Sequence, residues 1–199
     1  MSAGVALGKL NRSEKAIAVC DEVVSRYGSA PEAALREQVA GALVTKGITL
    51  GQLNRSEEEI AVYDEVVSRY GSAPEAALRK QVARALNNKG FALLCRAKAN
   101  WAVEATRLGD LQIAATLFIQ AEKEKEVAIQ PMVWSNQAYT TFLLGQPDTA
   151  RPLLKQALQQ GGAELYKETL SDLNIHPVPP DAEFRTLLEE IWAEVKPKS

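Results

Sequence analysis

Residues that usually carry catalysis are scarce in this sequence. Its 199 residues include one histidine, His176, and two cysteines, and only 6% are aromatic. A metal site needs a cluster of histidine, cysteine or acidic ligands, and a nucleophilic hydrolase needs a nucleophile beside a base. No phosphate-binding glycine loop or nucleophile motif occurs either. We therefore expect no catalytic residue, no metal and no cofactor, and we interpret the protein as a non-enzyme.

An excess of charge of one sign is also lacking. The 23 Lys and Arg residues and 25 Asp and Glu residues leave a net charge of −2, and they are interspersed, so there is no basic stripe for nucleic acid. No apolar run approaches the ~18 residues of a membrane span, and the N-terminus has no signal-peptide pattern. Cys20 and Cys95 stand alone, which is typical of reduced thiols. These features predict a cytoplasmic protein with neither nucleic acid nor membrane as a partner.

A duplication dominates what is present. The stretch NRSEKAIAVCDEVVSRYGSAPEAALREQVA, residues 11–40, recurs in near-identical form 43 residues later, at residues 54–83. Self-similarity at such a period is the mark of a repeat architecture. Apolar residues within each copy recur at three- and four-residue steps, which indicates amphipathic helices. The sequence therefore predicts an all-α protein.

Turn and capping signals divide the chain into expected helices. We expect a helix tail over 3–10, a tight turn at Asn11 and Arg12, and a helix from Ser13 to about Tyr27. Ser56 and Glu59 have the spacing of a capping box. Gly90 is the expected place for a kink in a long helix. The later expected helices span about 31–53, 56–70, 74–108, 110–130, 131–144, 146–162, 163–173 and 181–195.

Small and aromatic residues recur at matching places in successive helix pairs. The second unit has Gly47, Leu50, Ile60, Tyr63 and Val66; the third has Trp101, Ala102, Ala105, Gly109, Asp110, Ala114, Phe118 and Ala121; the fourth has Trp134, Ala138, Gly145, Ala150, Leu154 and Ala157. This pattern resembles the tetratricopeptide repeat (TPR). The sequence departs from the family in its 43-residue period, against about 34, in Glu59 where the family has alanine, and in Cys20 where it has an aromatic residue.

The resemblance implies a right-handed α-α superhelix, a TPR-like solenoid, with a C-terminal capping helix. Its units would span about 4–30, 31–73, 74–130 and 131–160, and residues 161–199 would form a cap within the same domain. Residues 3–10 correspond only to the end of a first helix, so we expect either a fragment of a longer array or an uncapped edge. An exposed stacking face at this N-terminal repeat edge would favour pairing with another chain.

The two copies differ at few positions, and these positions indicate where a binding site could lie. The differing pairs are Val5/Ile48, Ala6/Thr49, Lys9/Gln52, Lys15/Glu58, Ala16/Glu59, Cys20/Tyr63, Glu37/Lys80, Gly41/Arg84, Val44/Asn87 and Thr45/Asn88. Six of the ten lie on the first helix of a unit beyond its proline-led start, and in the family this helix lines a concave groove. Drift after a recent duplication is the alternative explanation. The candidate groove residues are Thr45, Ile48, Gln52, Arg84, Asn87, Asn88 and Phe91.

The chemistry of these side chains suits a peptide ligand. Asparagine offers a donor and an acceptor to an extended backbone, and Arg84 can bind a carboxylate through two parallel hydrogen bonds. The interpretation is a protein–protein interaction scaffold that binds a peptide or helix of a partner in its groove. The alternatives are a self-assembly module, which would form a homo-oligomer, and an accessory repeat segment of a larger multidomain protein.

Overall fold

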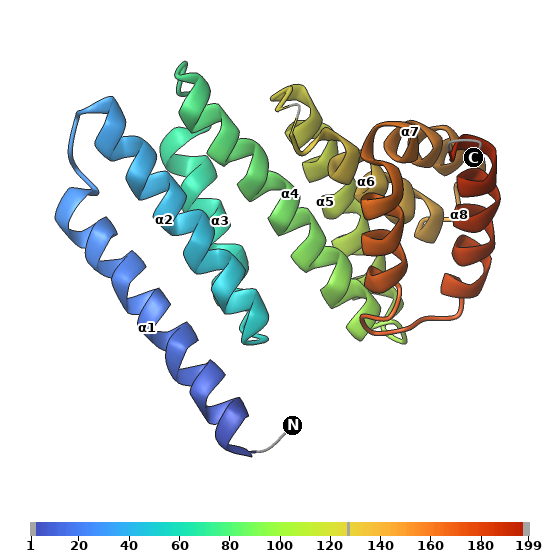
Figure 1. The fold of residues 1–199 in the computed structure, drawn as a ribbon, viewed down its shortest axis with the longest axis horizontal. Helices are drawn as coiled ribbons and strands as arrows, with labels where there is room; N and C mark the ends of the chain where they lie inside the picture. The colour runs from blue at the N-terminus through green and yellow to red at the C-terminus, as the bar shows by residue number, and fades with distance from the viewer. Residues whose placement is uncertain (1–2, 127, 197–199) are drawn as a thin grey trace. The chain divides into compact units, whose positions relative to one another are not determined.

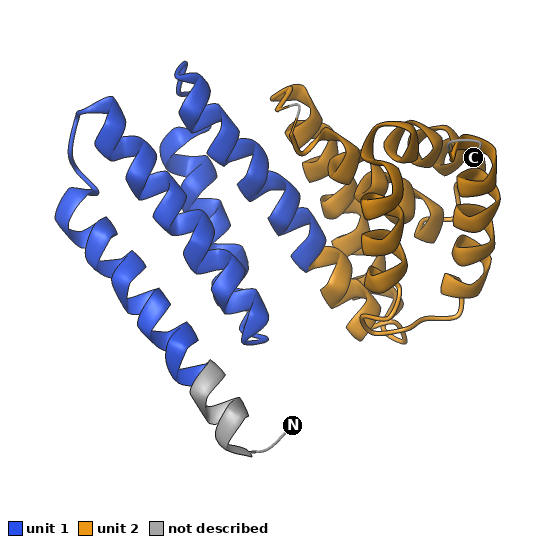
Figure 2. Ribbon diagram, viewed as in Figure 1, with its two compact units in different colours: residues 1–92 blue, residues 93–199 orange. Residues whose placement is uncertain are grey.

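The computed structural model describes residues 3–126 and 128–196, and for residues 3–9 it describes the backbone only. Within these residues the chain forms eight α-helices and no strand, so the all-α class is confirmed. The helices are α1 (Ala3–Tyr27), α2 (Ala33–Gln52), α3 (Ser56–Tyr70), α4 (Ala76–Ala99), α5 (Glu104–Lys123), α6 (Gln130–Leu143), α7 (Pro147–Asp172) and α8 (Asp181–Val195). They are coloured in chain order in Figure 1. The chain divides into two compact units, residues 1–92 and 93–199, and the boundary falls inside α4 (Figure 2).

In the first unit, α2 packs between α1 and α3, and successive helices run antiparallel (Figure 1). Glycines on α2 allow its close approach to α3. A Cβ atom added at Gly47 would collide with the Tyr63 ring, and one added at Gly51 would lie 2.7 Å from both Glu59 carboxylate oxygens. Tyr63 is fully buried as a result. Small residues on α2 thus let the paired helices pack closely around a large side chain.

The duplication is also visible in the ion pairs of the first unit. Lys46 on α2 binds Asp21 on α1, with Nζ 2.6 Å from Oδ1. Lys89 on α4 binds Asp64 on α3, and these two residues are the counterparts of the first pair 43 residues later. The ion pair between α1 and α2 therefore has an equivalent between α3 and α4. The sequence repeat is thus also a structural repeat.

The second unit is built on the packing of α6 against α7, and its core lies between α5, α6, α7 and α8. Phe184 of α8 is fully buried against the rings of Tyr139 and Phe142, with centroid distances of 4.6 and 5.2 Å. The helix α7 is interrupted at Gly162, whose φ is +61°, which agrees with the helix end expected at this glycine. The expected last helix is confirmed at Asp181–Val195.

Two expected boundaries are wrong. The chain does not turn at Asn11, because Ala3–Tyr27 is one continuous helix. The expected helix over 74–108 ends at Ala99, and α5 begins at Glu104. Asn100 caps the end of α4 by donating its side-chain amide to the Arg96 carbonyl at 2.9 Å. Gly109 and Asp110 therefore lie inside α5, not at a helix start.

The expected capping box at the start of α3 is also absent. The helix begins at Ser56 as expected, but its N-cap residue Arg55 makes no side-chain capping hydrogen bond. The Glu59 carboxylate instead lies against Gly51 of α2. The Glu59 side chain extends into the interface between α2 and α3 and does not turn back to the start of its helix. Its carboxyl group therefore lies among largely buried side chains.

Candidate functional site

A hollow of about 390 Å³ opens on the first unit where α1, α2 and α4 meet. We call it the α1/α2/α4 hollow. Its walls combine apolar side chains of α1 with polar side chains of α2 and α4. The lining residues are Val19, Cys20, Val23, Glu37, Gln38, Gly41, Ala42, Thr45, Gln81 and Arg84. A mixed apolar and polar concavity of this size is what a few side chains of a bound peptide require.

Two polar groups in the hollow are suited to a ligand. The Arg84 guanidinium can donate two parallel hydrogen bonds to a carboxylate. Gln81 is 8% exposed, and its Oε1 atom is buried without a hydrogen-bond partner. Leaving a buried acceptor unpaired costs about 1–3 kcal/mol. A donor on a ligand, reached by rotation of this amide, would recover that free energy.

The structure brings two of the seven predicted groove residues into this hollow. Thr45 and Arg84 line it, and the other five do not. Asn87 is 3% exposed, so it belongs to the buried side of α4, where its Nδ2 lies 3.3 Å from Oδ1 of Asn88. Ile48, Asn88 and Phe91 are half-buried, and Gln52 is exposed at the end of α2.

The residues that differ between the copies gather into one polar cluster in the second repeat. Glu59 and Tyr63 of α3 lie close enough to interact, and Asn88 and Arg84 of α4 act on the same tyrosine hydroxyl. Burial raises the pKa of Tyr63, and the nearby Glu59 carboxylate raises it further. Burial also raises the pKa of Glu59 from 4.5 to about 7, against the lowering effect of its hydrogen bond with Tyr63. This carboxyl group therefore keeps its proton to a higher pH than an exposed glutamate does.

The corresponding positions of the first repeat carry smaller side chains, and these side chains line the α1/α2/α4 hollow. Cys20, Gly41 and Thr45 line it and correspond to Tyr63, Arg84 and Asn88. The second repeat thus has large polar side chains at positions where the first repeat has small ones. The sequence differences pointed to these positions, but only the structure shows that those of the first repeat line a hollow and that those of the second repeat interact with one another.

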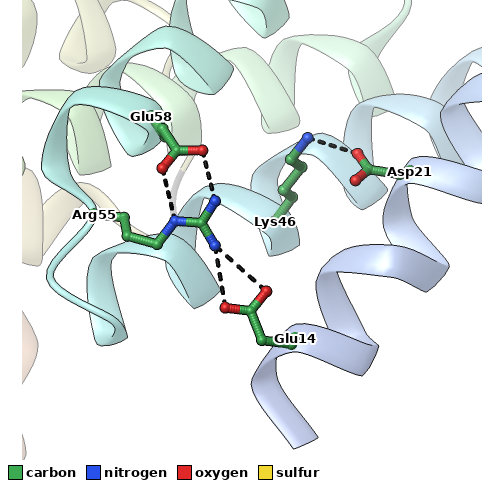
Figure 3. A network of polar contacts seen from close by, with 5 residues as sticks. All are labelled: Glu14, Asp21, Lys46, Arg55 and Glu58. Carbon is green, nitrogen blue, oxygen red and sulfur yellow. Dashed lines mark hydrogen bonds and ion pairs between the residues drawn. The ribbon is translucent and has the colours of Figure 1, made fainter. Parts of the chain in front are cut away.

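An exposed ion-pair network joins α1 to the α2–α3 connection (Figure 3). Arg55 binds Glu58 through two hydrogen bonds of 2.6 and 2.7 Å and also reaches Glu14 at 3.2 Å. The Lys46–Asp21 pair lies beside it in Figure 3. Water and salt screen exposed ion pairs of this kind, so the network contributes little to the stability of the fold.

A second hollow, of about 620 Å³, lies near the loop between α1 and α2. Its two arginines already have partners. Arg36 binds Glu75 at 2.6 Å and lies over the Tyr70 ring, and Arg69 binds Glu65 at 2.5 Å. Because its cations are engaged within the protein, this hollow has less to offer an acidic ligand than the α1/α2/α4 hollow.

The second unit contains a buried polar cluster that sequence reasoning missed. The side chain of Lys98 is 1% exposed; its Nζ lies 3.3 Å from Asp181 Oδ2 and near the carbonyl oxygens of Asp172 and Leu173. Tyr139 donates a hydrogen bond to Asp181 from α6. Burial lowers the pKa of Lys98, and the Asp181 carboxylate opposes that shift. These contacts hold the start of α8 against α4 and α6, so the role of this lysine is structural.

Two polar side chains of the second unit bind within the core. Arg96 binds the buried Asp110 through two hydrogen bonds of 2.8 and 2.9 Å. Trp134 is 8% exposed and donates its indole N–H to Glu122, which agrees with a packing role. Among the residues that the structure describes, no cluster of His, Cys, Asp and Glu could hold a metal ion.

No protein-family model, curated protein sequence or solved structure matches the chain. In the described part of the chain, every helix is too short or too polar to cross a membrane.

Proposed function

We propose that this protein is a non-enzymatic scaffold that binds a peptide or a helix of a partner protein in the cytoplasm. The proposal includes a TPR-like superhelical arrangement of its helix pairs. What supports it most is the α1/α2/α4 hollow, which is lined by Thr45, Arg84 and Gln81. Thr45 and Arg84 are also at positions where the two repeats differ, and that observation does not depend on the cavity.

The hollow favours an acidic peptide. Arg84 would bind a carboxylate of the ligand, Gln81 would accept a backbone N–H, and the α1 wall at Val19 and Val23 would bury an apolar side chain. The opposing charge of Glu37 in the same hollow would reject a ligand with acidic groups at both ends.

A random peptide library selected against the folded protein tests this function. The selected peptides should carry an acidic residue, and Arg84→Ala should weaken their binding at least tenfold, since hydrogen bonds to charged groups contribute about 1.5–3 kcal/mol. Lys80→Ala is the matched control: it removes a positive charge one turn earlier on α4, from a residue that does not line the hollow. Equal binding by Arg84→Ala and wild type would contradict the assignment.

A further inference from the structure

The exposed face of α5 has no charged side chain along most of its length. Glu104 in the first turn and Lys123 in the last turn are exposed, and the exposed residues between them are all uncharged. A surface helix normally carries charged residues on the side that faces solvent. On α3, for example, four of the six exposed residues are charged. Depletion of charge is characteristic of the centre of protein interfaces, so this face of α5 has the composition of a covered surface.

Large apolar side chains occupy the same face. Ile113 is 50% exposed and Ile119 is 42% exposed. The charged residues of this part of α5 are satisfied within the second unit: Arg107 lies over the Trp101 ring, Asp110 binds Arg96, and Glu122 accepts the Trp134 hydrogen bond. An exposed apolar patch on an otherwise uncharged helix face marks an interaction site.

Gly109 lies at the centre of this face, and nothing in the described part of the chain requires a glycine there. Its φ is not in the left-handed region, and a Cβ atom added to it would point into open space. A glycine inside a helix costs about 0.5–1 kcal/mol relative to alanine, and it is favoured where another backbone approaches closely. Gly109 therefore fits a face against which a second helix packs.

The order of the side chains along this face makes it complementary to itself. Its members recur at three- and four-residue steps: Ala105, Thr106, Gly109, Gln112, Ile113, Thr116, Ile119 and Gln120. The small residues lie in the N-terminal half and the larger ones in the C-terminal half. Two antiparallel copies place small residues against large ones, whereas parallel copies would place large against large. Antiparallel copies also bring Glu104 of each copy to the end at which Lys123 of the other lies.

We propose that this face of α5 is covered by α5 of a second copy of the chain, in an antiparallel pair whose two-fold axis passes between Gln112 and Ile113. At the axis each of these two residues faces its own counterpart, and two facing glutamine amides can each donate and accept a hydrogen bond. On either side Gly109 faces Thr116, and every such contact occurs twice, as a two-fold interface requires. The outer contacts are Ala105 with Ile119 and Thr106 with Gln120.

The pairing is separate from peptide binding. The helix α5 belongs to the second unit, whereas the α1/α2/α4 hollow lies in the first. None of the residues that form the exposed face of α5 lines the hollow. The dimer can therefore hold or fail independently of the proposed function.

Disulfide cross-linking at the axis tests the pairing. In a background of Cys20→Ala and Cys95→Ala, Gln112→Cys places a single thiol opposite its own counterpart. We expect mild oxidation to give a covalent dimer at twice the monomer mass of 21.7 kDa. Gln156→Cys is the matched control, because Gln156 is an exposed glutamine on another helix, α7. Equal cross-linking at positions 112 and 156 would show random collision and overturn the proposal.

Gly109→Ala separates a contact between copies from a role within the fold. In dilute solution, where the protein is unpaired, it should raise the free energy of unfolding, because alanine is the better helix former. In sedimentation equilibrium it should raise the dissociation constant of the dimer about tenfold, because each added methyl group collides with Thr116 of the other copy. An unchanged dissociation constant would contradict pairing at this face.

Charge reversal tests the antiparallel order. Glu104→Lys gives a chain with lysine at both ends of the interface, and Lys123→Glu gives one with glutamate at both ends. Each variant alone should dimerise about tenfold more weakly, because two exposed ion pairs become repulsive. An equimolar mixture of the two should associate as strongly as wild type, since lysine then meets glutamate at both ends. A mixture that fails to recover association, or a wild-type protein that stays monomeric at high concentration, would overturn the proposal.

Discussion

The buried carboxyl group of Glu59 should make the stability of the first unit depend on pH near neutrality. Burial between α2 and α3 raises its pKa from 4.5 to about 7. The folded state therefore binds a proton more tightly than the unfolded state does. This contribution to stability is fully present below about pH 4.5, and it is lost as the pH rises through 7.

The size of the effect follows from the shift. A displacement of about 2.5 pH units would be worth about 3.4 kcal/mol at 1.36 kcal/mol per unit. Glu59 is partly exposed, so solvent screening makes the real effect smaller than this upper limit. We expect the free energy of unfolding to fall by about 1.5 kcal/mol between pH 5 and pH 8. Glu59→Gln keeps the shape of the side chain and cannot ionise. It should remove this part of the pH dependence and make the protein more stable than wild type at pH 8.

Urea denaturation followed by circular dichroism from pH 5 to pH 8 measures the change in unfolding free energy. Asp172 in the second unit supplies the control, because burial raises its pKa to about 6 with the same sign. Asp172→Asn should therefore remove the loss of stability that is complete by about pH 6 and leave the loss that continues to about pH 7. A carboxyl titration of Glu59 by NMR with a midpoint near 4.5, or a Glu59→Gln curve parallel to wild type, would refute the reasoning.

Three further predictions concern stability, each measured as the free energy of unfolding in urea. Gly47→Ala should destabilise by about 1–3 kcal/mol, since the added methyl group collides with a buried ring; Gly109→Ala, where nothing lies within 4 Å inside α5, should stabilise by about 0.5–1 kcal/mol. Equal effects at the two glycines would contradict the packing of α2 on α3. Lys98→Met should cost about 3–5 kcal/mol because Asp181 is left buried without its cation, and adding Asp181→Asn should restore most of this loss. Gln81→Leu should be neutral or stabilising by about 1 kcal/mol, since it removes an unpaired buried acceptor, and a clear loss of stability would show that this amide has a partner.

The helices were largely predictable because their apolar periodicity and caps are local features. The start of α3 at Ser56, and α8 at Asp181–Val195, match the expected ranges. The continuation of α1 through Asn11, where a turn was expected, was not predictable from local sequence. The same three residues, Leu-Asn-Arg, form a turn at 53–55, where Asn54 has a φ of +58°, and lie within a helix at 10–12. The difference is that α2 packs back on α3, so tertiary contacts decide the conformation of this tripeptide.

The candidate site was predictable only in part. Comparison of the copies selected Thr45 and Arg84, which meet in one hollow, because a duplicated sequence shows where the chain has changed. It could not show that Glu59 and Tyr63 of α3 lie beside Asn88 of α4, since that contact depends on the packing of helices. The break after Ala99 was missed because residues 100–103 contain neither glycine nor proline, and Asn100 closes the helix with its own side chain.

The most direct test of the proposed function is an NMR chemical-shift map of the labelled protein with one of the selected acidic peptides. The account predicts that the largest amide shifts occur at Thr45, Gln81 and Arg84, around the α1/α2/α4 hollow, and that they vanish in Arg84→Ala but persist in Lys80→Ala. Shifts confined to the second unit, or a map unchanged by Arg84→Ala, would contradict it.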